Sequence, residues 1–179
     1  MITRVRYFTG QLLGVADFET EQRYLIESNR RRNRWLHGWG IVGGLQVSTA
    51  RSEVVVAPGF ALDCVGNEIE VEEPARWPLP DAKQGKARYL VLTFTEHAAS
   101  PVPATAEPGD GEGDAVAYSR VDEGWALAYT PEDPASGHGP AARRTPPCGR
   151  AHGIALARLV RTDGRWRIDP RYRVGSARV

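Results

Sequence analysis

The pattern of hydrophobic and polar positions changes its period near residue 40. Before that point it is helical, with an acidic first half that includes Asp17 and a run of arginines between Arg30 and Arg34. Acidic first turns and basic last turns match the helix macrodipole, and Gly38 just after the pattern is a common helix stop. The sequence therefore predicts one long helix from about Val15 to Leu36.

The apolar face of this predicted helix is narrow. Phe18, Leu25 and Leu36 lie near one stripe, but polar residues such as Gln22 and Arg32 interrupt it. A helix of this length with so little apolar surface is poorly explained as a core element alone. We expect it to pack one side on its own domain and to offer the other side to a partner.

After residue 44 the pattern becomes strand-like. Short β-branched or alternating segments are separated by Gly and Pro turns, at 45–47, 54–56, 60–62, 68–71, 88–95, 125–129 and 154–161. The Thr162-Asp163-Gly164 turn predicts a C-terminal hairpin. Many short strands and no second long helix predict a mainly β fold, a β-sandwich or partly open barrel behind an N-terminal helix.

These patterns divide the chain into an arm and a β-domain. We expect residues 1–44 to form the helical arm with a glycine hinge, and residues 45–179 to form the β-domain. The hinge residues are Gly38, Gly40, Gly43 and Gly44. Within the β-domain, 98–117 and 130–150 are rich in Pro, Gly and charge, and long segments of this kind are usually functional or disordered loops.

Composition adds little to this picture, but the distribution of charge does. The 179 residues suit one domain, and 41% hydrophobic and 25% charged residues are ordinary values. Residues 1–51 carry eight Arg against four acids, whereas 96–133 carry nine acids against one Arg. Segregated charge favours oriented contact between complementary faces, although the blocks can also neutralise one another within the fold. The candidate interface residues at the basic end of the helix are Arg30, Arg31, Arg34, Trp35 and Trp39.

Nothing along the chain predicts catalysis, nucleotide binding or a membrane span. The glycines from Gly38 to Gly43 match the letters of a dinucleotide fingerprint, but here a helix precedes them and a strand follows, which reverses the required order. No nucleophile elbow is present. A secretion signal and an apolar run of about 18 residues are also lacking. We expect a cytoplasmic, non-enzymatic protein without a cofactor, and the acidic middle of the chain argues against nucleic acid.

The two cysteines leave two alternatives open, a single disulfide between Cys64 and Cys148 or a metal site. Cys148 and His152 are four residues apart, and His138 precedes them by ten. A structural zinc commonly uses two closely spaced pairs of ligands, and the second pair is missing here. Cys64, His37 and His97 could join such a set only through the fold, so we expect no metal.

Several motifs together resemble one family. They are Tyr7-Phe8-Thr9-Gly10-Gln11-Leu12-Leu13, the segment from Asn33 to Leu45, Arg88-Tyr89-Leu90-Val91-Leu92, Arg120-Val121-Asp122-Glu123-Gly124-Trp125 and Ile154-Ala155-Leu156-Ala157-Arg158-Leu159. In these motifs the chain is similar to small proteins associated with contractile injection systems, the bacterial phage-tail-like particles built from sheath, tube, spike and baseplate.

The resemblance implies a structural subunit at the baseplate or an appendage, with other particle subunits as its partners. The alternative is a β-module at a tail tip or fibre that recognises a glycan or receptor. In that case exposed aromatics such as Tyr118, Trp125 and Tyr129 would form a stacking platform.

Overall fold

The computed structural model describes residues 2–81, 85–103, 116–136, 138, 148 and 150–177. Over these residues it contains helix α1 (Val15–Leu36) followed by ten strands. The strands are β1 (Gly40–Gly44), β2 (Val47–Ala50), β3 (Glu53–Val56), β4 (Gly59–Leu62), β5 (Glu68–Val71), β6 (Ala75–Pro78), β7 (Ala87–Pro103), β8 (Val116–Thr130), β9 (Ile154–Thr162) and β10 (Arg165–Ile168). The predicted helix is confirmed, with the expected bounds.

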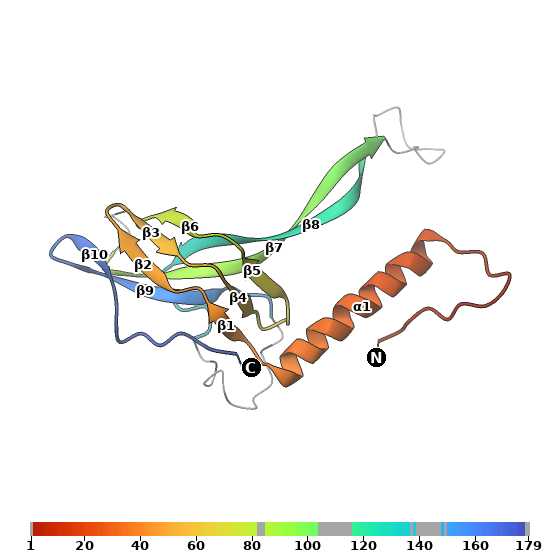
Figure 1. Ribbon diagram of the computed structural model, residues 1–179, viewed down its shortest axis with the longest axis horizontal. Coiled ribbons are helices and arrows are strands. Elements are labelled where there is room, and N and C mark those ends of the chain that lie inside the picture. The colour runs from red at the N-terminus through yellow and green to blue at the C-terminus, as the bar shows by residue number, and fades with distance from the viewer. Residues whose placement is uncertain are drawn as a thin grey trace.

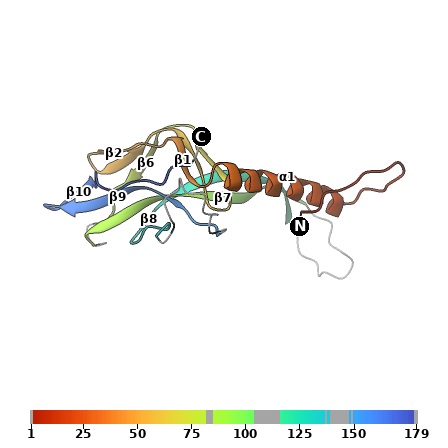
Figure 2. The same ribbon diagram turned by 90° about the horizontal axis from the view of Figure 1, so that it is seen from below.

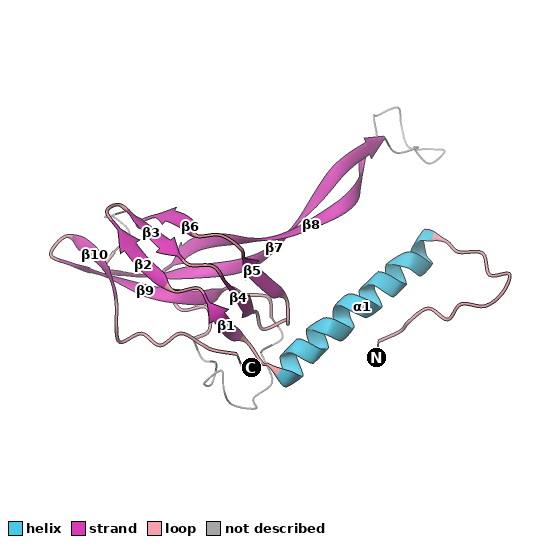
Figure 3. Cartoon of the chain, in the orientation of Figure 1, coloured by secondary structure: helices cyan, strands magenta, loops and turns pink. Residues whose placement is uncertain are grey.

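The strands form three antiparallel sheets around one core (Figures 1 and 3). Their orders are β1-β4-β5, β2-β3-β6 and β10-β9-β7-β8. Each sheet contributes to the same hydrophobic cluster, for example Ile69 from the first, Val54 from the second and Leu90 from the third. The fold is therefore mainly β behind an N-terminal helix, as predicted.

Side-chain alternation explains how short strands build this core. In β5, Glu68 and Glu70 are exposed while Ile69 and Val71 are buried. Successive side chains of a strand point to opposite faces, so one face meets the core and the other meets water. The strand at 68–71 is as the pattern predicts.

The β7–β8 hairpin is longer than the sequence pattern indicates. Pairing continues from Tyr89 opposite Thr130 to Pro103 opposite Val116, so both strands enter the predicted loop 98–117. Strand β9 pairs with β7 only up to Leu92, which leaves one edge of β7 unpaired beyond that point. Proline is tolerated on such an unpaired edge, because the N–H that it lacks has no neighbouring strand to bond there. The rest of that predicted loop, 104–115, lies outside the described residues.

The second predicted loop, 130–150, begins with turns at 131–136. The Asp133 carboxylate accepts a hydrogen bond from the backbone N–H of Ala135 at 2.9 Å, and the hydroxyl of Tyr172 donates to the same carboxylate at 2.5 Å. The start of this segment is thus fixed against the C-terminal part of the chain. Residues 137, 139–147 and 149 lie outside the described residues.

Three of the four glycines of the predicted hinge, Gly40, Gly43 and Gly44, belong to strand β1, and Gly38 precedes it. Strand β1 pairs with β4, and on its other side the N–H of Ile41 donates to the carbonyl of Gly175 at 2.8 Å. Gly40 and Gly44 have φ angles of 115° and 68°, in the region that favours glycine. The segment from Gly40 to Gly44 is therefore held within the sheets, because β4 pairs with one edge of β1 and the C-terminal segment bonds to the other.

Helix α1 projects away from the sheets, and the N-terminal segment extends beyond it and turns back (Figures 1 and 2). None of its residues is buried. No helix in the described ranges combines the length and apolar character needed to cross a membrane. The helix is therefore an arm attached to the β-domain at its C-terminal end.

Candidate functional site: the helical arm and its seat

The turn between β4 and β5, residues 63–67, receives the helix, and we call it the seat. Its centre is Asp63, which is only 2% exposed. One carboxylate oxygen accepts the backbone N–H groups of Val65, Gly66 and Asn67 at 2.8, 2.8 and 2.9 Å. The other accepts the Asn67 side-chain amide at 2.7 Å. A buried carboxylate with four donors fixes the shape of the turn.

The last turns of α1 bind the seat through polar groups. Arg30 donates from Nε to the side-chain oxygen of Asn67 at 2.6 Å. The Asn33 amide donates to the carbonyl of Gly66 at 3.0 Å and to the carboxylate of Glu68 at 2.9 Å, and the Arg34 guanidinium donates to the carbonyl of Val65. Because these bonds are directional, they set the angle of the helix as well as its attachment.

Close approach of the backbones reinforces this joint. Gly66 has a φ angle of 99°, and a Cβ atom at this position would overlap the backbone of Arg30. Arg30 also forms ion pairs with Glu27 at 3.3 Å and with Glu96 of β7 at 3.6 Å. The helix is therefore held by the seat and by the base of the hairpin.

Beyond the seat, the arm presents apolar side chains to solvent. Leu12 is 94% exposed and Trp35 is 66% exposed. Among the residues that the structure describes, 16 large hydrophobic ones are exposed, and ten of these lie in this part of the chain: Tyr7, Phe8, Leu12, Leu13, Val15, Phe18, Leu25, Ile26, Trp35 and Leu36. A concentration of exposed apolar side chains on one element is typical of an interaction surface. We call this set the arm surface.

The β7–β8 hairpin is a second projection on the same side of the β-domain as α1 (Figure 1). Its exposed apolar residues are Val102, Val116, Tyr118, Val121 and Trp125. The hairpin thus adds further exposed apolar side chains on this side of the β-domain.

The predicted interface residues have different surroundings. Arg30 and Arg34 bond within the chain, whereas Arg31 and Trp35 are exposed. Trp39 lies edge-on to His138, with 5.1 Å between ring centroids. Sequence reasoning did not identify the seat residues Asp63 and Asn67 as partners of the helix, although Gly66-Asn67, three residues after Asp63, is a recognisable turn signal.

The aromatic residues named for glycan binding do not share one surface. Tyr118 and Trp125 are seven positions apart on β8, so strand alternation directs them to opposite faces. Tyr129 packs against the core with its hydroxyl buried and without a hydrogen-bond partner. Burial raises the pKa of Tyr129 to about 12.

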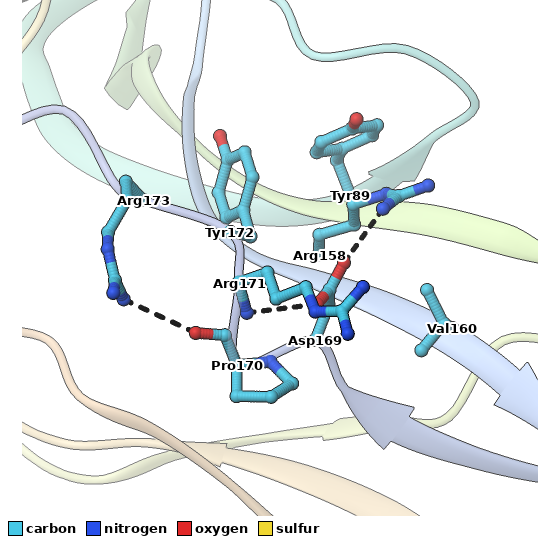
Figure 4. A pocket seen from close by; sticks show the side chains of 8 residues that line it. All are labelled: Tyr89, Arg158, Val160, Asp169, Pro170, Arg171, Tyr172 and Arg173. Atoms are coloured by element: carbon cyan, nitrogen blue, oxygen red, sulfur yellow. Dashed lines mark hydrogen bonds and ion pairs between the residues drawn. The ribbon is translucent and has the colours of Figure 1, made fainter.

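A hollow near the C-terminal end contains paired charges (Figure 4). The Arg158 guanidinium donates a hydrogen bond to the Asp169 carboxylate at 2.7 Å. The ring of Tyr172 packs edge-on against that of Tyr89, with 5.4 Å between the ring centroids. The backbone N–H of Arg171 and the Arg158 side chain lower the pKa of Asp169, because both stabilise the carboxylate. These groups fasten the C-terminal segment to β7 and β9.

A cluster of four metal-ligating side chains lies beside the seat. The Sγ atoms of Cys64 and Cys148 and ring nitrogens of His138 and His152 all lie within 4.8 Å of one another. Burial raises the pKa of the Cys64 thiol to about 12, with the neighbouring Cys148 as a further cause. Burial and the nearby His152 lower the pKa of His138. The sequence analysis expected no metal because a second ligand pair was missing, whereas the fold adds Cys64 to the set.

Comparisons with known proteins give a match of fold only. No family model and no curated protein sequence matches the chain. A chain of the type VI secretion system TssK-TssF-TssG baseplate subcomplex aligns with a TM-score of 0.53 and 16% identity, over 97% of this chain and 62% of that one. A chain of the baseplate complex from the type VI secretion system aligns with a TM-score of 0.54 and 15% identity, over 97% of this chain and 60% of that one. The crystal structure of TssK aligns with a TM-score of 0.52 and 14% identity, over 94% of this chain and 43% of that one.

This chain therefore spans less than two thirds of the length of each of these baseplate proteins. At such identities the likeness concerns the arrangement of helix and strands. It extends over nearly the whole of the present chain.

Proposed function

We propose that this chain is a non-enzymatic structural subunit of a contractile injection system, located at the baseplate or an appendage of it. The observation that carries the proposal is the arm surface, a set of exposed apolar side chains on the N-terminal segment and on the projecting helix α1. The fold behind it is similar to that of chains in baseplate complexes. Its partners would be neighbouring particle subunits, and assembly would take place in the cytoplasm.

The physical argument rests on what the isolated chain leaves uncovered. Exposed apolar side chains are stabilised when a partner removes them from water, by about 25 cal/mol per Å². The polar bonds between α1 and the seat hold the arm at a fixed angle before any partner arrives. A preorganised arm loses less conformational freedom on binding, which favours assembly.

Three carboxylates near the joint of helix and sheets have structural roles, which supports the non-enzymatic part of the proposal. Asp63 organises the seat, Glu68 accepts a hydrogen bond from Asn33, and Glu96 forms an ion pair with Arg30. Each carboxylate is thus engaged in holding the helix against the sheets.

Trp35→Ala tests this proposal, with Trp77→Ala as its matched control. Both tryptophans are exposed, but Trp35 lies on the arm and Trp77 lies on β6 of the β-domain. Tagged variants would be expressed with the complete particle, and their recovery in purified sheathed particles would be measured. We expect wild type and Trp77→Ala to copurify and Trp35→Ala to be depleted. Absence of the wild-type chain from intact baseplates would contradict the proposal.

The alternative of glycan recognition is tested with the isolated chain on a glycan array. We expect no binding, because Tyr118 and Trp125 do not form one stacking platform. Specific binding that is lost in Trp125→Ala would favour a receptor-binding module.

A further inference from the structure

Three parts of the fold bring the four ligating side chains together. Cys64 comes from the seat, His138 follows the turns at 131–136, and Cys148 and His152 precede β9. The Sγ atom of Cys64 lies 3.6 Å from Nδ1 of His138, although 74 positions separate them. Such a meeting point between distant segments is where a crosslink constrains a chain most.

The surroundings fix the first two residues. The backbone of Cys64 belongs to the turn that Asp63 holds, and its side chain is fully buried. The bond between Asp133 and Tyr172 anchors the turns before His138. The ring of His138 contacts two other rings. Its centroid lies 5.1 Å from that of Trp39 and 4.9 Å from that of His152. Both ligands are therefore positioned before any ion binds.

His152 has one ring nitrogen that is bonded and one that is buried without a hydrogen-bond partner. Its Nδ1 lies 3.0 Å from the carbonyl of Gly153, which makes Nδ1 the protonated nitrogen. Its Nε2 is buried and has no hydrogen-bond partner. Buried polar atoms are normally satisfied, and a backbone carbonyl on one ring nitrogen is the usual arrangement when the other nitrogen binds a metal.

Backbone groups of Arg150 position the Cys148 side chain. The backbone N–H of Arg150 donates to its Sγ at 3.4 Å. Thiolate is the form of cysteine that binds metals, and hydrogen bonds to the ligand atoms orient them and tune the site.

We propose that Cys64, His138, Cys148 and His152 bind one zinc ion in a closed, structural site. Two sulfur and two nitrogen ligands are a set that tetrahedral zinc uses. Zinc lies about 2.3 Å from sulfur and about 2.0–2.1 Å from nitrogen, which places tetrahedral ligands about 3.3–3.8 Å apart. The observed upper limit of 4.8 Å means that the ligand atoms would draw together by at most about 1.0–1.5 Å around the ion.

The zinc ion would join His138, Cys148 and the segment that leads into β9 to the seat. Because Cys64 and Asn67 share one turn, the ion would also stiffen the turn that receives α1. A disulfide between Cys64 and Cys148 is the competing use of the cysteines. It gives no role to the unsatisfied Nε2 of His152 or to the position of His138.

The test uses the full chain, purified with a reductant so that both thiols are available. Zinc content would be measured after dialysis, and Co²⁺ would replace zinc as a spectroscopic probe. We expect about one zinc ion per chain, the intense visible absorption of tetrahedral Co²⁺ and a thiolate-to-cobalt band in the near ultraviolet. We also expect a chelator to lower the melting temperature by several degrees, because the ion binds the folded state.

Two variants compare a proposed zinc ligand with a residue outside the cluster: Cys148→Ser and, as its control, His97→Asn. Cys148 is exposed, so its substitution removes a ligand without opening the core, and His97 is an exposed histidine outside the cluster. We expect Cys148→Ser to weaken zinc binding by more than about 100-fold, beyond the 10- to 100-fold effect of outer partners. His97→Asn should bind like wild type.

Three results would overturn the proposal. The first is a wild-type chain that holds no zinc at micromolar free ion under reducing conditions. The second is an octahedral, weakly absorbing Co²⁺ complex. The third is unaltered zinc affinity in Cys148→Ser.

Discussion

At the scale of single residues, the glycines of β1 differ in what they allow. Gly44 has a φ angle of 68°, and a Cβ atom there would overlap the carbonyl of Pro58. Gly43 has no atom within 4 Å of the same position and no such φ angle. The glycine-rich sequence at 40–44 does not show which glycine is required, because that depends on which neighbouring backbone comes close.

Gly44→Ala should therefore lower the free energy of unfolding by about 1–3 kcal/mol, through strain and steric overlap. Gly43→Ala, its matched control, should change it by no more than about 0.5 kcal/mol. Urea unfolding followed by circular dichroism measures both. Equal stability of the two variants would mean that β1 does not approach Pro58 as described.

Asp169 gives a pH dependence at the same scale. Its pKa is lower in the folded chain than its ordinary value of 3.8, because Arg171 and Arg158 stabilise the carboxylate. A lowered folded-state pKa adds stability that is complete above the ordinary pKa and is lost as the pH falls through the folded-state pKa. We expect Asp169→Asn to be less stable than wild type at pH 7, and the difference to shrink below about pH 4. A difference that grows in acid would contradict this assignment.

At the scale of elements, the sequence pattern predicts what local forces decide. The helix at Val15–Leu36 and the strand at 68–71 follow from the macrodipole pattern and from alternation. The extent of β7 does not, because its prolines become tolerable only where β9 ends and leaves an edge unpaired. The cluster of Cys64 with His138 depends on the meeting of distant segments, and no local spacing encodes it.

The helix also explains why neighbouring arginines should behave differently. Arg30 bonds to Asn67 and Glu96, so Arg30→Glu should lower the free energy of unfolding by about 1–2 kcal/mol. Arg31 is exposed, so Arg31→Glu should leave stability unchanged and weaken incorporation into the particle. Urea unfolding and a pull-down with particle proteins measure the two effects. Destabilisation by Arg31→Glu would place that side chain within the fold instead.

At the scale of the whole molecule, polar and apolar contacts have separate tasks. The core joins three sheets, polar groups of the seat orient the arm, and apolar side chains face outward from the arm. The charge blocks are partly neutralised inside the fold, as the pair between Arg30 and Glu96 shows. We propose that the outward-facing arm surface takes part in assembly.

Site-specific crosslinking inside the assembled particle tests that claim most directly. A photo-reactive amino acid would replace Leu12, which is 94% exposed on the arm, and as a control it would replace Glu73, which is exposed on the β-domain. Mass spectrometry would identify the crosslinked proteins. We predict that position 12 captures another subunit of the particle in high yield and that position 73 captures it weakly or not at all. Equal yields at the two positions, or crosslinks from position 12 only within the same chain, would contradict assembly through the arm.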